Sequence, residues 1–105
     1  MNTDLTPAFI TEELARVSRC VDFRHERLLR SNSTTIVENL DLARSIIGAH
    51  GLKAIGAVES LKAADQAIEE LREDILCLDA NLRRHFFNNC DDAQDSIRAF
   101  IYLAE

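Results

Sequence analysis

The chain has 105 residues, of which 47% are apolar and 29% are charged, a balance typical of one globular domain rather than of a disordered segment. Its formal net charge of −6 disfavours nucleic-acid binding through bulk electrostatics. The polar N-terminal segment 1–11, the absence of a long apolar run and the odd number of cysteines favour a protein of the reducing cytoplasm.

The first expected helix runs from Thr6-Pro7 to about Arg30. Thr6 suits the N-cap and Pro7 the first helical position, where its missing N–H costs nothing. Apolar residues follow at helical spacings of four, three, four and seven, at Ile10, Leu14, Val17, Val21 and Leu28. The polar stretch Ser31–Thr34 then predicts a connector.

A second helix is expected between residues 35 and 50. The T-x-x-E sequence of Thr35–Glu38 fits a capping box at its start, and Gly51 fits a C-terminal cap. Its apolar stripe consists of Ile36, Leu40, Ala43 and Ile47.

The third segment carries the most regular pattern in the chain. Its apolar residues alternate by three and four, at Leu61, Ala64, Ile68, Leu71, Ile75, Leu78 and Leu82. Gly56 either interrupts this helix or lets another helix pack closely. Asn88-Asn89 is expected to end it, and Asp91-Asp92 to begin a short last helix.

These elements predict an all-α fold with a single domain over 1–105, a bundle of three to four up-and-down helices with one long central helix. A helix over 54–87 would span roughly 50 Å, too long for a compact monomer. We therefore expect a homodimer. The residues assigned to the core or oligomer seam are Leu61, Ile68, Leu71, Ile75, Leu78, Leu82, Phe100 and Ile101.

The outer face of the first expected helix combines aromatic and arginine side chains, which are enriched at binding hot spots. On a helical wheel these side chains lie opposite the apolar stripe, so we expect them to contact a partner: Phe9, Arg16, Arg19, Phe23, Arg27 and Arg30. The alternative is that this face packs within the bundle or dimer.

The remaining motifs do not indicate catalysis, a metal or a cofactor. The three histidines lie in different segments and no closely spaced ligand pair is present. Paired carboxylates occupy expected polar faces and helix starts, and no glycine-rich phosphate loop occurs. Cys20, beside Arg16 and Arg19, has the most electropositive setting of the three cysteines, although an exposed or interface thiol is the simpler interpretation.

In size, acidity and helix content, but in no motif, the chain is similar to the small helical antiactivators with which bacteria silence quorum-sensing regulators. That similarity implies a module that binds and occludes a transcription factor or signalling protein. An acidic immunity protein or antitoxin is the alternative, and its contact residues would be Asp65, Glu69, Glu73 and Asp79. Direct DNA binding is disfavoured because acidic residues dilute the arginines of the first helix.

Overall fold

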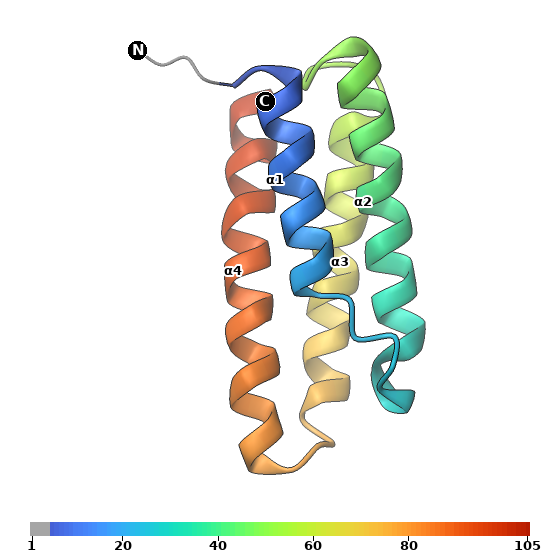
Figure 1. Ribbon diagram of the computed structural model, residues 1–105, viewed down its shortest axis with the longest axis vertical. Coiled ribbons are helices and arrows are strands. Elements are labelled where there is room, and N and C mark those ends of the chain that lie inside the picture. The colour runs from blue at the N-terminus through green and yellow to red at the C-terminus, as the bar shows by residue number, and fades with distance from the viewer. Residues whose placement is uncertain (1–4) are drawn as a thin grey trace.

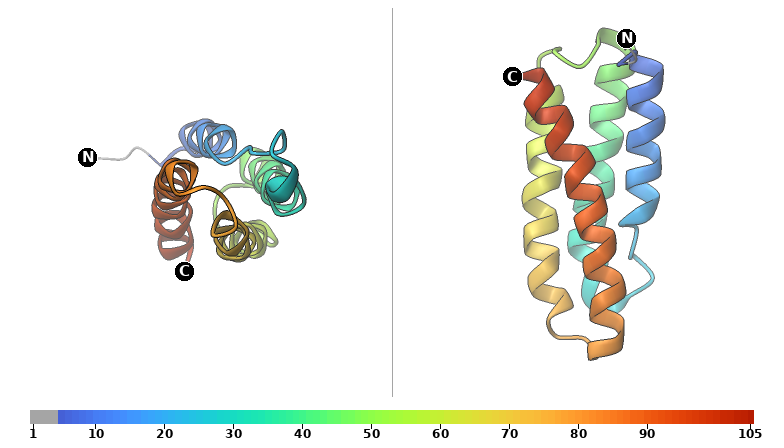
Figure 2. Two further views of the ribbon diagram at one scale, coloured as in Figure 1. Left: turned by 90° about the horizontal axis from the view of Figure 1, so that it is seen from below. Right: turned by 90° about the vertical axis from the view of Figure 1, so that its left-hand side faces the viewer.

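The computed structural model describes residues 5–105 and arranges them as four antiparallel helices joined by short connections (Figure 1). The helices are α1 (Pro7–Cys20), α2 (Arg30–His50), α3 (Ala57–Ile75) and α4 (Ala80–Ala104), with a 3₁₀ turn, η1 (Arg27–Leu29), before α2. Seen end-on, α1 and α3 each lie between α2 and α4 (Figure 2). The expected four-helix, up-and-down bundle is confirmed.

The apolar stripes of the helices form the centre of this bundle. The predicted stripe positions of α1, α2 and α3 are buried as expected, apart from Leu28, Leu78 and Leu82. The largest fully buried side chains are Ile10, Leu14, Leu29, Ile36, Leu40, Ile47, Leu61, Ile68, Leu71, Ile75, Ile97 and Val17. Aliphatic packing therefore holds the helices in register, as hydrophobic burial does in bundles generally.

α1 ends at Cys20, ten residues earlier than predicted. A buried hydroxyl stabilises the turn that follows: Ser33 Oγ accepts from the Phe23 N–H at 2.7 Å and donates to the Val21 carbonyl at 2.8 Å. Both backbone groups therefore bond to a side chain instead of to the i±4 backbone partners of an α-helix. Leu28, expected on the apolar stripe, lies in η1 and is 55% exposed.

α2 begins at Arg30, so the predicted connector Ser31–Thr34 is helical. The expected capping box at Thr35 is also wrong, because the Thr35 hydroxyl donates to the Ser31 carbonyl one turn earlier, at 3.3 Å. The predicted end is confirmed. Gly51, with φ of 94°, closes α2 in a conformation that other residues rarely adopt.

Gly56 interrupts the third expected helix, again with φ of 94°, and α3 begins just after it. The Glu59 carboxylate accepts from the Gly56 N–H at 3.1 Å and so satisfies one group at the helix start. α3 then ends at Ile75, so no helix spans 54–87. The whole bundle is 42 Å long, so no helix has the excess length from which a homodimer was expected.

α4 has 25 residues and is the longest helix, although the pattern predicted a break at Asn88-Asn89 and a start at Asp91-Asp92. Two of these polar residues bind α1 instead of capping helices. The Asn89 side chain donates to the Cys20 carbonyl at 3.0 Å, and Asp92 forms an ion pair with Arg16. Their side chains therefore contribute to helix packing.

The residues assigned to an oligomer seam lie mainly in the core of the single chain. Leu61, Ile68, Leu71 and Ile75 are fully buried, Phe100 is buried, and Ile101 and Leu78 are half-buried. Leu82 is 42% exposed because it lies on α4, beyond the turn at residues 76–79. Within residues 5–105, no helix combines the length and hydrophobicity that crossing a membrane requires.

Candidate interaction surface

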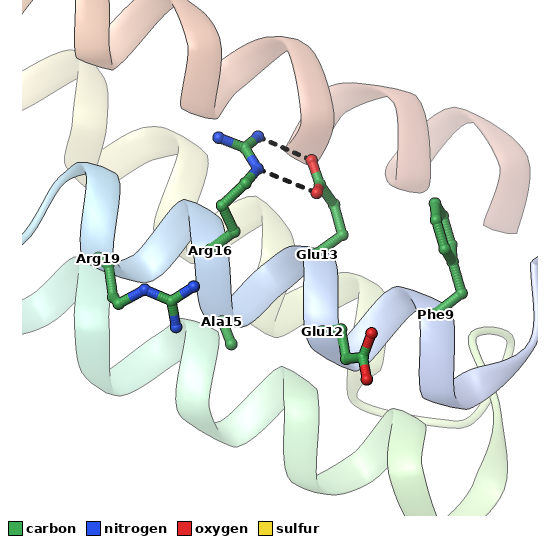
Figure 3. Close-up of a pocket in the computed structure, with 6 residues that line it drawn as sticks. All are labelled: Phe9, Glu12, Glu13, Ala15, Arg16 and Arg19. Atoms are coloured by element: carbon green, nitrogen blue, oxygen red, sulfur yellow. Dashed lines mark hydrogen bonds and ion pairs between the residues drawn. The ribbon is translucent and has the colours of Figure 1, made fainter.

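The outer surface of α1 has an open depression of about 430 Å³ lined by Phe9, Glu12, Glu13, Ala15, Arg16 and Arg19. Phe9, Glu13 and Arg16 point toward α4, whereas Glu12 and Arg19 point away from it (Figure 3). The Phe9 ring is 48% exposed. This surface contains three of the six residues predicted to contact a partner.

Arg16 is already engaged within the bundle. Its guanidinium donates to both Glu13 oxygens at 3.0 and 2.7 Å and to Asp92 at 2.8 Å (Figure 3 shows the Glu13 pair). These hydrogen bonds lower the pKa of Glu13 and of Asp92. Ser96 of α4 also donates to Glu13, at 2.8 Å. Arg16 therefore links α1 to α4.

Phe23 was predicted on the exposed face, and this prediction is wrong. Because α1 ends at Cys20, the chain turns and carries the Phe23 ring into the core, where it is 4% exposed. It packs edge-on against Phe86 of α4, with ring centroids 4.5 Å apart. Phe23 thus anchors the α1–α2 connection.

Arg27 and Arg30 do not share a face with Phe9 either. Arg27 lies in η1 and Arg30 begins α2, at the end of the bundle where α1 finishes, whereas Phe9 lies near the start of α1. Figure 1 shows these two regions at opposite ends of the molecule. The predicted face therefore separates into two regions, with Arg19, in the last turn of α1, nearer to Arg27 and Arg30.

The end that carries the α1–α2 and α3–α4 connections, residues 19–34 and 74–86, is here called the loop end (Figures 1 and 2). It contains half of the twelve basic residues of the chain: Arg19, Arg24, Arg27, Arg30, Arg83 and Arg84. Four acidic residues accompany them, giving a net charge of +2, while the other described residues sum to −7. The molecule is therefore electrically polarised along its length.

Most basic side chains outside the loop end are neutralised by carboxylates: Arg16, Arg44, Lys62, Arg72 and Arg98 all form ion pairs. At the loop end only Arg24 does so, with Asp22 at 2.7 Å. Over residues 5–105, six basic side chains have no ion pair, and all except Lys53 lie at the loop end.

Two of these five arginines bind backbone carbonyls instead. Arg30 donates to the Arg24 carbonyl at 2.8 Å, and Arg83 donates to the Leu76 carbonyl at 3.3 Å. In the described part of the chain, the guanidinium groups of Arg19, Arg27 and Arg84 make no hydrogen bond, and all three residues are exposed. Their full hydrogen-bonding capacity faces solvent.

Exposed leucines accompany these arginines. Leu28 in η1 is 55% exposed, Leu76 after α3 is 58% exposed, and Leu82 in the first turn of α4 is 42% exposed. Asn32 of α2 donates to Asp74 of α3 at 2.7 Å, which ties the start of α2, directly after η1, to the end of α3. The loop end thus carries exposed cationic and apolar groups on η1, on the turn after α3 and on the first turns of α4, and α3 contacts both η1 and α4.

The interface between α3 and α4 contrasts with the loop end. Gln94 of α4 is 2% exposed; it accepts from Arg72 at 2.6 Å and donates to Asp65 and Glu69 at 3.0 and 2.8 Å. The Gln94 hydrogen bond is the main cause of the lowered pKa of Glu69. Arg98 pairs with the same two carboxylates at 3.0 Å. This network pairs the charges of Asp65, Glu69, Arg72 and Arg98 within the bundle.

Thiol chemistry finds little support in the geometry. Burial raises the pKa of Cys90 to about 12. Burial, then the hydrogen bond to Asp92, raises the pKa of Cys20, so the neighbouring Arg16 does not produce a reactive thiolate. Across residues 5–105 no group of three or more His, Cys, Asp or Glu side chains is placed to hold a metal ion.

Sequence reasoning missed Arg83 and Arg84 because they belonged to the assumed continuation of the third helix. It also assigned Leu28 and Leu82 to apolar stripes, although the turns at 21–26 and 76–79 expose both. A local signal was present: Arg83 and Arg84 follow Leu82 in a segment, residues 80–90, that contains no acidic residue.

Comparison of the chain with protein-family models, with curated proteins and with solved structures gave no match.

Proposed function

We propose that this chain is a non-enzymatic protein-interaction module that binds and occludes a transcription factor or signalling protein. The observation that carries the proposal is the concentration at the loop end of arginines without a carboxylate partner, beside which Leu28, Leu76 and Leu82 are exposed. Arginine is one of the residue types that supply much of the binding energy at protein interfaces, whereas leucine is under-represented there and isolated surface leucines need no explanation, so the arginines carry the proposal.

The contrast with the rest of the surface supports the same function. Arg16, Arg72 and Arg98 hold α4 against α1 and α3 through ion pairs, so their charges serve the fold. Arg27 and Arg84 have no such role. The alternative, an immunity protein or antitoxin, would use Asp65, Glu69, Glu73 and Asp79. Asp65 and Glu69 are occupied by Arg98 and Gln94, whereas Glu73 and Asp79 are exposed and have no ion pair within the described residues.

Similarity in profile to bacterial antiactivators adds the mode of action to this proposal. An antiactivator acts by covering a surface that its target needs for dimerisation or DNA binding. For a bundle 42 Å long, occupation of such a surface by one end of the molecule would exclude a second macromolecule by volume alone. The arginines would then position the bundle and the bulk of the bundle would exclude the competitor.

Affinity capture with matched baits tests the function. The wild-type chain and the double variant Arg27→Glu/Arg84→Glu would be incubated with extract of the source cells, and bound proteins identified by mass spectrometry. We expect one regulator to bind the wild type and to be lost from the variant. The purified regulator should also lose DNA binding or its signalling output when the wild-type chain is added.

The matched control is Lys53→Glu/Lys62→Glu, which makes the same charge change at the other end of the bundle and should retain the regulator. If a nuclease or other toxin were captured instead, and if the loop-end variant and the control variant both neutralised it equally, the result would contradict the proposal and favour the antitoxin alternative. Catalytic turnover by the chain itself would contradict it as well.

A further inference from the structure

We infer that the loop end recognises an acidic amphipathic helix of the partner protein, an inference that rests on the proposed function and specifies its ligand. The inference follows from three features of the loop end: its charge, its apolar groups and the acidic surface that adjoins it. Each restricts the class of ligand further.

The charge of the loop end requires an anionic ligand. Arg19, Arg27 and Arg84 are exposed and have no carboxylate within the described chain. Arginine guanidinium groups bind carboxylates in a planar, often bidentate geometry that is stronger than a neutral hydrogen bond. Aspartate and glutamate side chains of a partner would provide those acceptors, as Asp22 does for Arg24.

The leucines favour a ligand that is partly apolar. Leu28, Leu76 and Leu82 expose between 42% and 58% of their surface and lie on η1, the turn after α3 and α4. A purely charged ligand would leave these side chains in water. A helix with leucine-like residues along one face and carboxylates at the edges of that same face places both groups against one surface, because residues three and four apart share a face.

The acidic surroundings restrict the ligand to a short segment. Outside the loop end the described residues carry a net charge of −7, so an extended polyanion would run onto repulsive surface. A DNA duplex and an anionic membrane both extend in this way. A helix of a few turns can contact the loop end alone, and the negative charge of the remaining surface repels an acidic helix from every other face.

The test is selection from a displayed library of 18-residue helical peptides with fixed leucine positions and randomised polar positions. The full-length chain serves as bait. We expect the enriched peptides to be rich in aspartate and glutamate on the face beside the leucines. Synthetic versions should bind the wild-type chain in fluorescence anisotropy, with affinity that falls as salt increases.

Three variants separate the contributions. Arg27→Glu/Arg84→Glu should weaken binding of the enriched peptides by about tenfold or more, because each reversal replaces an attraction by a repulsion. Leu28→Ser/Leu82→Ser should weaken it at constant charge. Lys53→Glu/Lys62→Glu should leave it unchanged. Circular dichroism of each variant checks that the bundle remains folded.

Several results would overturn the inference: no enriched peptide, enrichment without acidic residues, or equal affinity for all three variants. Tighter binding to a DNA duplex or to phosphatidylserine vesicles than to the selected peptides would also do so. Self-association of the wild type that Arg27→Glu/Arg84→Glu abolishes would assign the loop end to a second copy of the chain.

Failure of this inference is distinguishable from failure of the proposed function. A captured regulator whose binding survives the loop-end variants but is lost in Phe9→Ser would keep the function and move its surface to α1, where Phe9 is 48% exposed. Absence of any regulator together with acidic peptide binding at the loop end would retain the recognition chemistry alone.

Discussion

The two flanks of α4 and the loop end use arginine in different ways. Along α4, Arg16 and Arg72 each bind carboxylates of the bundle at 2.6–2.8 Å, and a buried glutamine extends the second network. At the loop end, Arg27 and Arg84 have no carboxylate partner in the described chain. The same residue type therefore supports the fold in one region and remains available in the other.

This difference reflects what lies beneath each region. The face of α4 that packs inward includes small and polar residues, among them Cys90, Ala93 and Gln94, so polar contacts supplement a modest apolar interface. The loop end is held from below by Phe23, which packs on Phe86, and by Ser33, which pairs two backbone groups of the turn. The guanidinium groups of Arg19, Arg27 and Arg84 make no contact of this kind within the described residues.

The largest expected effect on stability comes from the burial of Phe23 in the core beneath the loop end. Phe23→Ala should destabilise the bundle by about 3–5 kcal/mol, the usual cost of removing a buried phenylalanine. Phe9→Ala, at a ring 48% exposed, should cost far less. Urea unfolding of both variants measures the difference. Equal small effects would show that Phe23 is not an anchor.

Ser33→Ala tests the same turn and is expected to have a smaller effect on stability than Phe23→Ala. Its hydroxyl pairs the Phe23 N–H and the Val21 carbonyl, both buried, so removal should cost about 1–3 kcal/mol. Ser45→Ala, on an exposed part of α2, is the control and should be nearly neutral. Loss of protection of the Phe23 amide in hydrogen exchange would locate the effect at the turn.

Acid should weaken the attachment of α4 to α1. Hydrogen bonds from Arg16 lower the folded-state pKa of Glu13 and Asp92 below ordinary values of 4.5 and 3.8. Their stabilising contribution is therefore complete above those ordinary values and is lost as pH falls through the lowered ones. Unfolding free energy measured from pH 7 to pH 3 should fall, and Glu13→Gln should flatten the lower part of the curve.

The sequence predicts the helices well where apolar spacing and burial coincide. Ile10 to Val21 and Leu61 to Ile75 follow the pattern and are buried. It fails at the turn after Ile75, since residues 76–79 contain no glycine or proline and the spacing continues by coincidence to Leu82. Nothing local distinguishes a helical leucine from one in such a turn, so only the packing of α4 against α3 reveals the reversal.

The candidate surface was only partly predictable for the same reason. Arg19, Arg27 and Arg30 were identified as contact residues, but a helix was assumed to carry them together with Phe9. The turn that separates them depends on a hydrogen bond between Phe23 and Ser33, ten residues apart in sequence. Such a contact has no signature in helical periodicity, and the contribution of Arg84 arises only when the chain folds.

The central claim is that Arg27 and Arg84 at the loop end are structurally dispensable whereas Arg16 and Arg72 are not, and unfolding free energies of matched Arg→Gln variants test it most directly. Arg72→Gln should cost about 1.5–3 kcal/mol, because Gln94 and Asp91 lose a charged donor. Arg27→Gln and Arg84→Gln should each stay within about 0.5 kcal/mol of the wild type. Destabilisation by the loop-end variants as large as that of Arg72→Gln would contradict the account.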